Sequence, residues 1–111
     1  MKVTDMEVRT NERYEFVSIT EEVKRAVRES GVEEGFCIIS SAHTTAAVTV
    51  NEDYDPDVPR DLAAACKALV SGLDVRFEHA EGNSDSHLFT SLFGQSQHLL
   101  VRGGSPALGR W

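Results

Sequence analysis

"FCIIS", residues 36–40, is a continuous apolar run with two adjacent isoleucines, and it ends at a serine. A short run of this kind, rich in β-branched residues, predicts a buried strand. A second such run, "AAVTV", follows at 46–50, and only five polar or small residues separate the two. The pair places a sheet at the centre of the predicted fold.

The segments on either side predict more strands and interspersed helices. A helix is predicted to begin at Ser18, where Glu21 would complete a capping box, and to end at Gly31. A second helix is predicted over about 57–70 and a short one at 87–93. Further strands are predicted at 3–10, 14–18, 75–79 and 98–102, with a hairpin turn at Gly103-Gly104. This order predicts a single α+β domain over residues 1–111 with a mostly antiparallel sheet.

The charge and composition exclude several classes of protein. The net charge is −7 and no segment is rich in lysine or arginine, which argues against nucleic-acid binding. No apolar stretch approaches the ~20 residues of a membrane helix, and the first ten residues lack the apolar core of a signal peptide. We therefore expect a cytoplasmic protein without membrane contact. Cys37 and Cys66 lie among apolar neighbours and are expected to be buried free thiols.

Three histidines are candidates for a metal site. His43 precedes the second central strand, and His79 and His87 flank the polar loop "AEGNSDS". Three imidazoles with an open fourth position would suit a catalytic divalent metal. Their spacing alone favours the alternative that they are separate, unrelated side chains. His98 opens an apolar strand and has no predicted role.

Carboxylates gather after the second central strand. Glu52 stands at the strand end beside Asn51, where a general acid or base could lie. The alternative is an ordinary solvated carboxylate. The acidic loop that follows is not an EF-hand, because Val58 and Ala64 occupy the positions that require glycine and glutamate.

The segment "EGNSDS", 81–86, has the composition of an anion-binding loop. Gly82 permits unusual backbone angles, and Asn83, Ser84 and Ser86 offer hydrogen-bond donors. The segment lacks the lysine and the spacing of a nucleotide P-loop. A polar surface loop is the competing interpretation.

Taken together, five motifs resemble those of the YjbQ family of small proteins. They are "HTTAAVTVNE", "DPDVPRDL", "HAEGNSDSH", "SLFG" and "ALGRW", in this order, and the resemblance covers about residues 36–111. It implies a compact α+β fold with an antiparallel sheet folded towards a sandwich or barrel, assembled as a homotrimer. Family members usually continue past the last motif into a further strand, so we expect that strand to be absent here or to lie outside this sequence.

The resemblance also implies one polar site and a role for each of its residues. The implied catalytic residues are Glu52, His43 and Asn83. The implied substrate-binding residues are Thr44, Thr45, Asn51, Asp57, Gly82, Ser84 and Ser91. The implied metal ligands are His43, His79 and His87, with zinc as the expected ion, or magnesium for a diphosphate substrate.

Two functions follow from this site. The family is described as secondary thiamine-phosphate synthases, so the first is an enzyme that acts on a small phosphorylated or diphosphorylated metabolite, with a phosphoester hydrolase as a close variant. The second is a homotrimer that binds a metal or an anion without turnover. A protein with scattered histidines and no common pocket is the third possibility.

Overall fold

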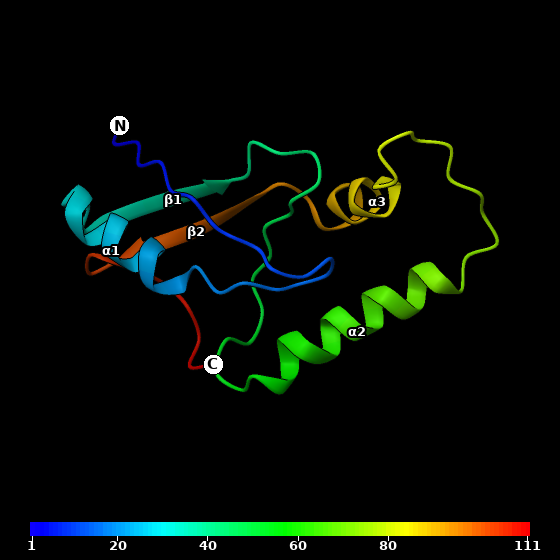
Figure 1. The fold of residues 1–111 in the computed structure, drawn as a ribbon. Helices are drawn as coiled ribbons and strands as arrows, with labels where there is room; N and C mark the ends of the chain where they lie inside the picture. Colours follow the sequence, from blue (N-terminus) through cyan, green and yellow to red (C-terminus); the bar gives the residue numbers. More distant parts are fainter.

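The computed structural model describes residues 1–111 and has an α+β architecture (Figure 1). Its elements are α1 (Thr20–Ser30), β1 (Glu34–Ser40), α2 (Asp57–Ser71), α3 (Ser84–Phe93), β2 (Ser96–Arg102) and β3 (Ser105–Pro106). The three strands form one antiparallel sheet in the order β1-β2-β3. The predicted fold class, α+β with an antiparallel sheet, is confirmed.

The sheet is built on a long pairing between distant parts of the chain. β1 pairs with β2 along its whole length, from Glu34 opposite Arg102 to Ser40 opposite Ser96. The predicted hairpin turn is confirmed, because Gly103 and Gly104 take positive φ angles of 55° and 76° and lead directly into β3. Glycine suits both positions because it has no Cβ atom, which would clash with the backbone at positive φ angles.

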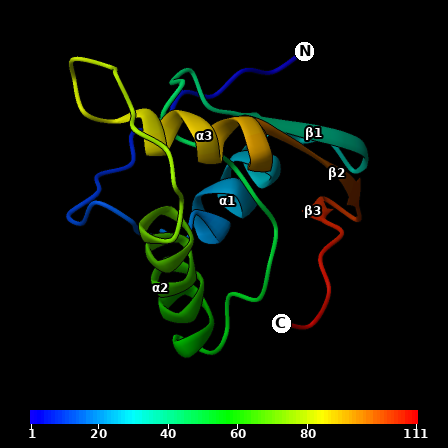
Figure 2. The same cartoon turned by 90° about the vertical axis from the view of Figure 1, so that its right-hand side faces the viewer.

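The small core lies between α1 and one face of the sheet. Val23 and Val27 of α1 pack with Val101 of β2, and Cys37 and Ile39 of β1 border them. These are the apolar positions of α1 that recur at helical spacing, so the amphipathic pattern explains the packing. Figure 2 shows α1 lying across the sheet in this way.

The start of α1 differs from the prediction. The helix begins at Thr20, with Ile19 at the N-cap position and no side-chain cap. The Ser18 hydroxyl instead donates a hydrogen bond to the carboxylate of Asp53, a residue far along the chain. The predicted capping box is therefore wrong, because the helix starts too late for Ser18 to be its N-cap, and the Ser18 oxygen accepts only from the N–H of Thr20 at 3.4 Å.

Four predicted strands are also wrong. The segments 3–10, 14–18, 46–50 and 75–79 have no regular secondary structure. At 46–50, the Val48 N–H donates to the carbonyl of Gly94, and the Gln97 side chain donates to the Val48 carbonyl, so the segment joins the end of β2 without entering its ladder. Val75, an apolar residue of the alternating segment 75–79, is 61% exposed and is therefore not packed in a core. A strand pattern gives a strand only where a second strand supplies hydrogen bonds.

The chain leaves much apolar surface uncovered. Only 6 of 111 residues are buried. The radius of gyration is 15.8 Å, whereas a compact domain of about this length has a radius of about 13 Å. The face of the sheet that points away from α1 carries Phe36 and Leu100, which lie opposite each other and are 69% and 58% exposed. This open face is apolar enough to mark an interaction surface.

The remaining sequence expectations concern the thiols and the membrane. Cys66 is buried, Cys37 is partly buried, and neither forms a disulfide. Burial raises the pKa of both thiols, which keeps them protonated. None of the helices combines the length and the apolar character that crossing a bilayer requires.

Candidate functional site

The polar loop "EGNSDS" continues directly into α3. Gly82 has a φ angle of 69°, as its predicted role requires, and its N–H donates to the His79 carbonyl at 3.0 Å. The N–H groups of Ser86 and His87 donate to the Asn83 carbonyl, so the second half of the loop forms the first turn of the helix. The helix predicted at 87–93 is confirmed and begins three residues earlier, at Ser84.

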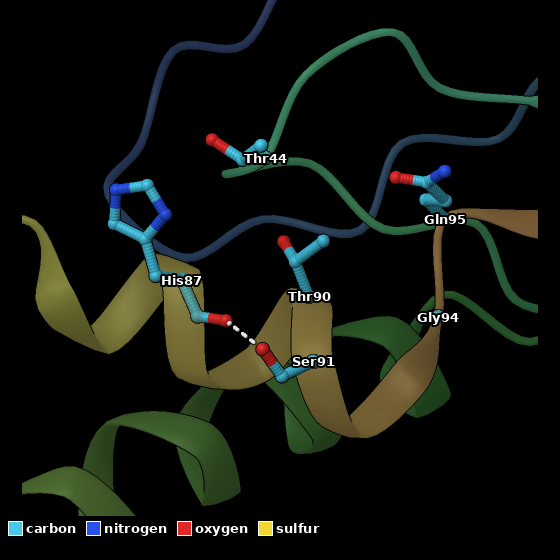
Figure 3. A pocket seen from close by; sticks show the side chains of 6 residues that line it. All are labelled: Thr44, His87, Thr90, Ser91, Gly94 and Gln95. Carbon is cyan, nitrogen blue, oxygen red and sulfur yellow. Dashed lines mark hydrogen bonds between the residues drawn. The ribbon is translucent and has the colours of Figure 1, made fainter.

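One side of α3 borders a polar hollow of about 470 Å³ (Figure 3). Its lining contains no hydrophobic residue and consists of Thr44, His87, Thr90, Ser91, Gly94 and Gln95. The hydroxyls of Thr90 and Ser91 donate to helix carbonyls one turn back, at 3.0 and 2.9 Å. Their oxygens keep lone pairs free as acceptors, and the His87 ring and the Gln95 amide can donate. Such a lining suits a small, strongly polar ligand.

Two of the three candidate histidines are neighbours. The rings of His79 and His87 meet edge to face, with centroids 5.4 Å apart and an interplanar angle of 70°. Glu81 places a carboxylate oxygen 3.9 Å from Nε2 of His79. Protonation of either ring would therefore add positive charge beside the hollow, partly balanced at His79 by Glu81.

The hydrogen bonds of His43 are local and do not involve this pair. Its N–H donates to the Ser41 hydroxyl, and Ser41 donates back to its carbonyl, which shapes the turn that carries Thr44. No three side chains of histidine, cysteine, aspartate or glutamate lie close enough in one chain to hold a metal ion. The three-histidine metal site therefore stays a prediction. Within a single chain, only two of its three ligands, His79 and His87, are in contact.

Glu52 lines a different hollow. This second hollow, of about 650 Å³, is lined by Glu52, Tyr54, Asp55, Pro56 and Trp111. The Glu52 N–H donates to the side chain of Asn51 at 2.7 Å, and the next N–H, that of Asp53, donates to the carbonyl of Trp111. In both views the C-terminal end lies well away from α3 (Figures 1 and 2). A single chain thus keeps the predicted base and the His87 hollow apart.

The other predicted residues divide between the two regions. Thr44 and Ser91 line the His87 hollow, and Ser84 opens α3. Asn83 has a buried side-chain oxygen with no hydrogen-bond partner, which is costly unless a donor reaches it. Asp57 forms an ion pair with Arg60 at the start of α2, away from the hollow beside α3. Thr45 lines neither hollow.

The sequence patterns missed a buried carboxylate, Asp85. It is 3% exposed, lies in the first turn of α3, and accepts hydrogen bonds from Arg13 and Tyr14. Burial raises the pKa of the Asp85 carboxyl, but these hydrogen bonds outweigh it and hold the pKa below its ordinary value. Burial and the bond to Asp85 raise the pKa of Tyr14. No local pattern could reveal the cluster, because its two halves are about seventy residues apart.

Comparison with known sequences identifies relatives over nearly the whole chain. Residues 4–111 match the family model described as "UPF0047 protein YjbQ-like". A UPF0047 protein of Methanocaldococcus jannaschii is 41% identical over 105 residues, which cover 95% of this chain and 75% of that protein. UPF0047 protein YugU of Bacillus subtilis is 36% identical over 106 residues, covering 96% of this chain and 80% of YugU.

Solved structures agree with this. A crystal structure of a YjbQ/UPF0047 family protein from Clostridium acetobutylicum superposes with a TM-score of 0.87 at 39% identity, covering 94% of this chain and 80% of that one. A protein of Sulfolobus solfataricus, described as YbjQ-like and of unknown function, gives a TM-score of 0.84 at 30% identity, covering 94% and 75%. The arrangement of helices and sheet described above is therefore shared with these proteins.

Proposed function

This chain belongs to the UPF0047 YjbQ-like family, and from that premise we propose that it binds the phosphate of a small metabolite in the hollow beside α3 and acts on it. The activity most in keeping with the resemblance is that of a thiamine-phosphate synthase. In that reaction a nitrogen of the thiazole phosphate forms a bond to the pyrimidine methylene carbon, and diphosphate leaves with the bonding electrons. Hydrolysis of a phosphoester is the close variant.

The observation that carries this proposal is a hollow lined by no hydrophobic residue, with His87 and two hydroxyl residues on one side of α3 and Thr44 opposite. Phosphate oxygens accept hydrogen bonds from hydroxyl, amide and imidazolium groups, so the Thr90 and Ser91 hydroxyls would have to rotate away from their helix carbonyls to donate to a phosphate. The volume of about 470 Å³ suits a small phosphorylated molecule. We assign substrate binding to Thr44, His87 and Ser91, and the support of the adjacent loop to Gly82 and Asn83.

A metal ion fits the single chain only in part. Catalytic zinc takes three protein ligands, and one chain brings together only His79 and His87. A zinc or magnesium ion would need a further ligand from a second copy of the chain or from the substrate. Within one chain, a protonated histidine would offset the charge of the leaving diphosphate, and hydroxyl groups would donate hydrogen bonds to it.

Assembly as a homotrimer is part of the proposal. The open apolar face of the sheet around Phe36, Ile38 and Leu100 supports it, because soluble proteins rarely leave such a face uncovered. To act as the base in the hollow beside α3, Glu52 would have to come from a second copy, because the Glu52 of the same chain lines the other hollow.

The second candidate is binding without turnover. It is favoured by one observation, the location of Glu52 in a hollow that His87 does not line. A general base must lie within hydrogen-bond reach of the proton that it takes. If the assembled protein keeps Glu52 and His87 apart, the hollow would hold an anion and no base would serve it.

Calorimetric titration with inorganic phosphate and pyrophosphate tests the binding step. The wild-type protein should bind, and His87→Ala and Ser91→Ala should bind weakly or not at all. Ser71→Ala is the matched control for Ser91→Ala, because Ser71 is an exposed serine at the end of α2 that lines neither hollow. Equal binding by wild type and His87→Ala would remove the proposal. A panel of phosphorylated substrates then separates an enzyme from a binding protein.

A further inference from the structure

We propose that Arg13, Tyr14 and Asp85 form a positioning cluster that fixes the turn between His79 and His87 and so sets the geometry of the phosphate site. None of the three lines the hollow. Their effect would pass through the backbone of the turn. The proposal rests on the proposed function only in assigning a ligand to His87.

The cluster is held by several directed hydrogen bonds. Nη2 of Arg13 donates to both carboxylate oxygens of Asp85 at 3.0 Å, and its Nε donates to one of them at 3.2 Å. The same Nη2 donates to the carbonyl of Gly82 at 2.9 Å. The Tyr14 hydroxyl adds a further bond to Asp85. One guanidinium thus joins both ends of the turn 82–85, a geometry that its fixed fork of donors allows.

The turn leads directly to both histidines. On one side, the Gly82 N–H donates to the carbonyl of His79 at 3.0 Å. On the other, the His87 N–H donates to the carbonyl of Asn83 at 3.3 Å. A shift of the turn would therefore move the two imidazoles relative to each other, and with them the donor that faces the hollow.

Little else holds this region from a distance. Every side-chain hydrogen bond that joins 79–91 to a segment far along the chain comes from Arg13 or Tyr14. The Tyr14 ring adds an edge-to-face contact with Phe89, with centroids 5.9 Å apart. α3 makes only sparse contacts with the other helices and strands. The N-terminal segment is accordingly the main lateral support of the helix that carries the site.

The exposure of the partners argues for positioning rather than stability alone. Asp85 is buried, but the Arg13 side chain is 61% exposed. Water screens the charge attraction of an exposed guanidinium, so the geometry of its hydrogen bonds to the buried Asp85 carboxylate matters more than its charge. If only charge mattered, a lysine would suit the site beside Asp85 equally well. The observed contacts instead use several donors of the planar guanidinium of Arg13.

The test compares Arg13→Lys, Arg13→Gln and Tyr14→Phe with wild type. Lys24→Gln, which breaks an exposed ion pair with Glu21 on α1, is the matched control. The first readout is the nuclear Overhauser contact between the ring protons of His79 and His87, which needs no ligand. The second is the dissociation constant for inorganic phosphate, and the third is the melting temperature.

We expect Arg13→Gln and Arg13→Lys to lose the contact between the rings and to bind phosphate about tenfold more weakly, as is typical when a supporting partner is removed. Arg13→Lys should keep the melting temperature of wild type, because it retains the charge beside Asp85. Tyr14→Phe keeps the aromatic contact with Phe89 and should stay folded, but it should weaken the contact between the His79 and His87 rings. It tests the proposal if the Arg13 variants fail to fold. The control should match wild type throughout.

Unchanged ring contact and phosphate affinity in folded Arg13→Lys and Tyr14→Phe would overturn the positioning role. If wild type itself does not bind phosphate, the proposed function fails, and the ring contact alone then decides the present proposal. If the melting temperature falls in parallel with the other two readouts in every variant, including Arg13→Lys, the cluster acts through stability. That result would also overturn the positioning role.

Discussion

The imidazole rings of His79 and His87 lie edge to face with their centroids 5.4 Å apart, at the two ends of a polar loop that turns at Gly82. This contact brings two titratable donors to the edge of a hollow whose lining is otherwise neutral and polar. The fold thus brings together two histidines that are separated in the sequence, and this contact supports the proposal of an anion site.

The buried carboxylate of Asp85 should make stability depend on pH. Because its pKa is lower in the folded protein than in the unfolded chain, its contribution is fully present above the unfolded value of about 3.9 and is lost as pH falls through the folded pKa. In urea unfolding, the difference between wild type and Asp85→Asn should be large near neutral pH and shrink below about pH 4. Asp61→Asn, an exposed carboxylate without a hydrogen-bond partner, is the control. A constant difference over the whole pH range would contradict this account of Asp85.

Replacing Val101 with alanine should reduce the small core. Val101 is 2% exposed and packs against Val23 and Val27, so Val101→Ala should lower the free energy of unfolding by about 2 kcal/mol. Val75→Ala, at a position that is 61% exposed, should change it by less than about 0.5 kcal/mol. Both are measured by denaturant unfolding. An equal loss in the two variants would mean that 75–79 is packed in solution, contrary to the arrangement described here.

Glu52→Gln should separate binding from catalysis. Glu52 lines a different hollow from His87, so the variant should bind inorganic phosphate as wild type does. Turnover of any substrate found in the panel should fall by at least about a hundredfold if Glu52 is the base. Asp55→Asn, which alters another carboxylate of the same hollow, is the matched control. Full activity in Glu52→Gln would end its catalytic role and leave the phosphate site intact.

The open face of the sheet should govern assembly. Light scattering at micromolar concentration should show a trimer for wild type, and Phe36→Glu should shift it to monomer, because a charge on a buried apolar interface is strongly unfavourable. Arg25→Glu places the same side chain, with a larger change of net charge, at an exposed position of α1 outside the open face and should stay trimeric. A wild-type monomer, or a trimer that tolerates Phe36→Glu, would count against this interface.

The sequence by itself determined the parts of the fold whose signals are local. The helix predicted over about 57–70 matches α2, because its apolar spacing, its proline in the first turn and its terminal glycine all act within a few residues. The apolar runs at 36–40 and 98–102 became the central pair of strands, and Gly103-Gly104 became the turn after them. Gly82 likewise took the positive φ angle that its loop required. Thr44, His87 and Ser91, which were named from motif residues alone, line one hollow, and their roles in a site stay predictions.

Only the tertiary structure decided which of the other patterns were realised. A helix satisfies its hydrogen bonds within its own segment, but a strand depends on a partner, so 46–50 and 75–79 could read as strands and still stay irregular. The same dependence on distant partners governs the site. The burial of Asp85 requires Arg13 and Tyr14 from the other end of the chain, and the separation of Glu52 from His87 follows from the path of 46–53 away from α3. The path of the folded backbone determines which side chains meet. The separation of two residues along the sequence does not reveal whether they will be in contact.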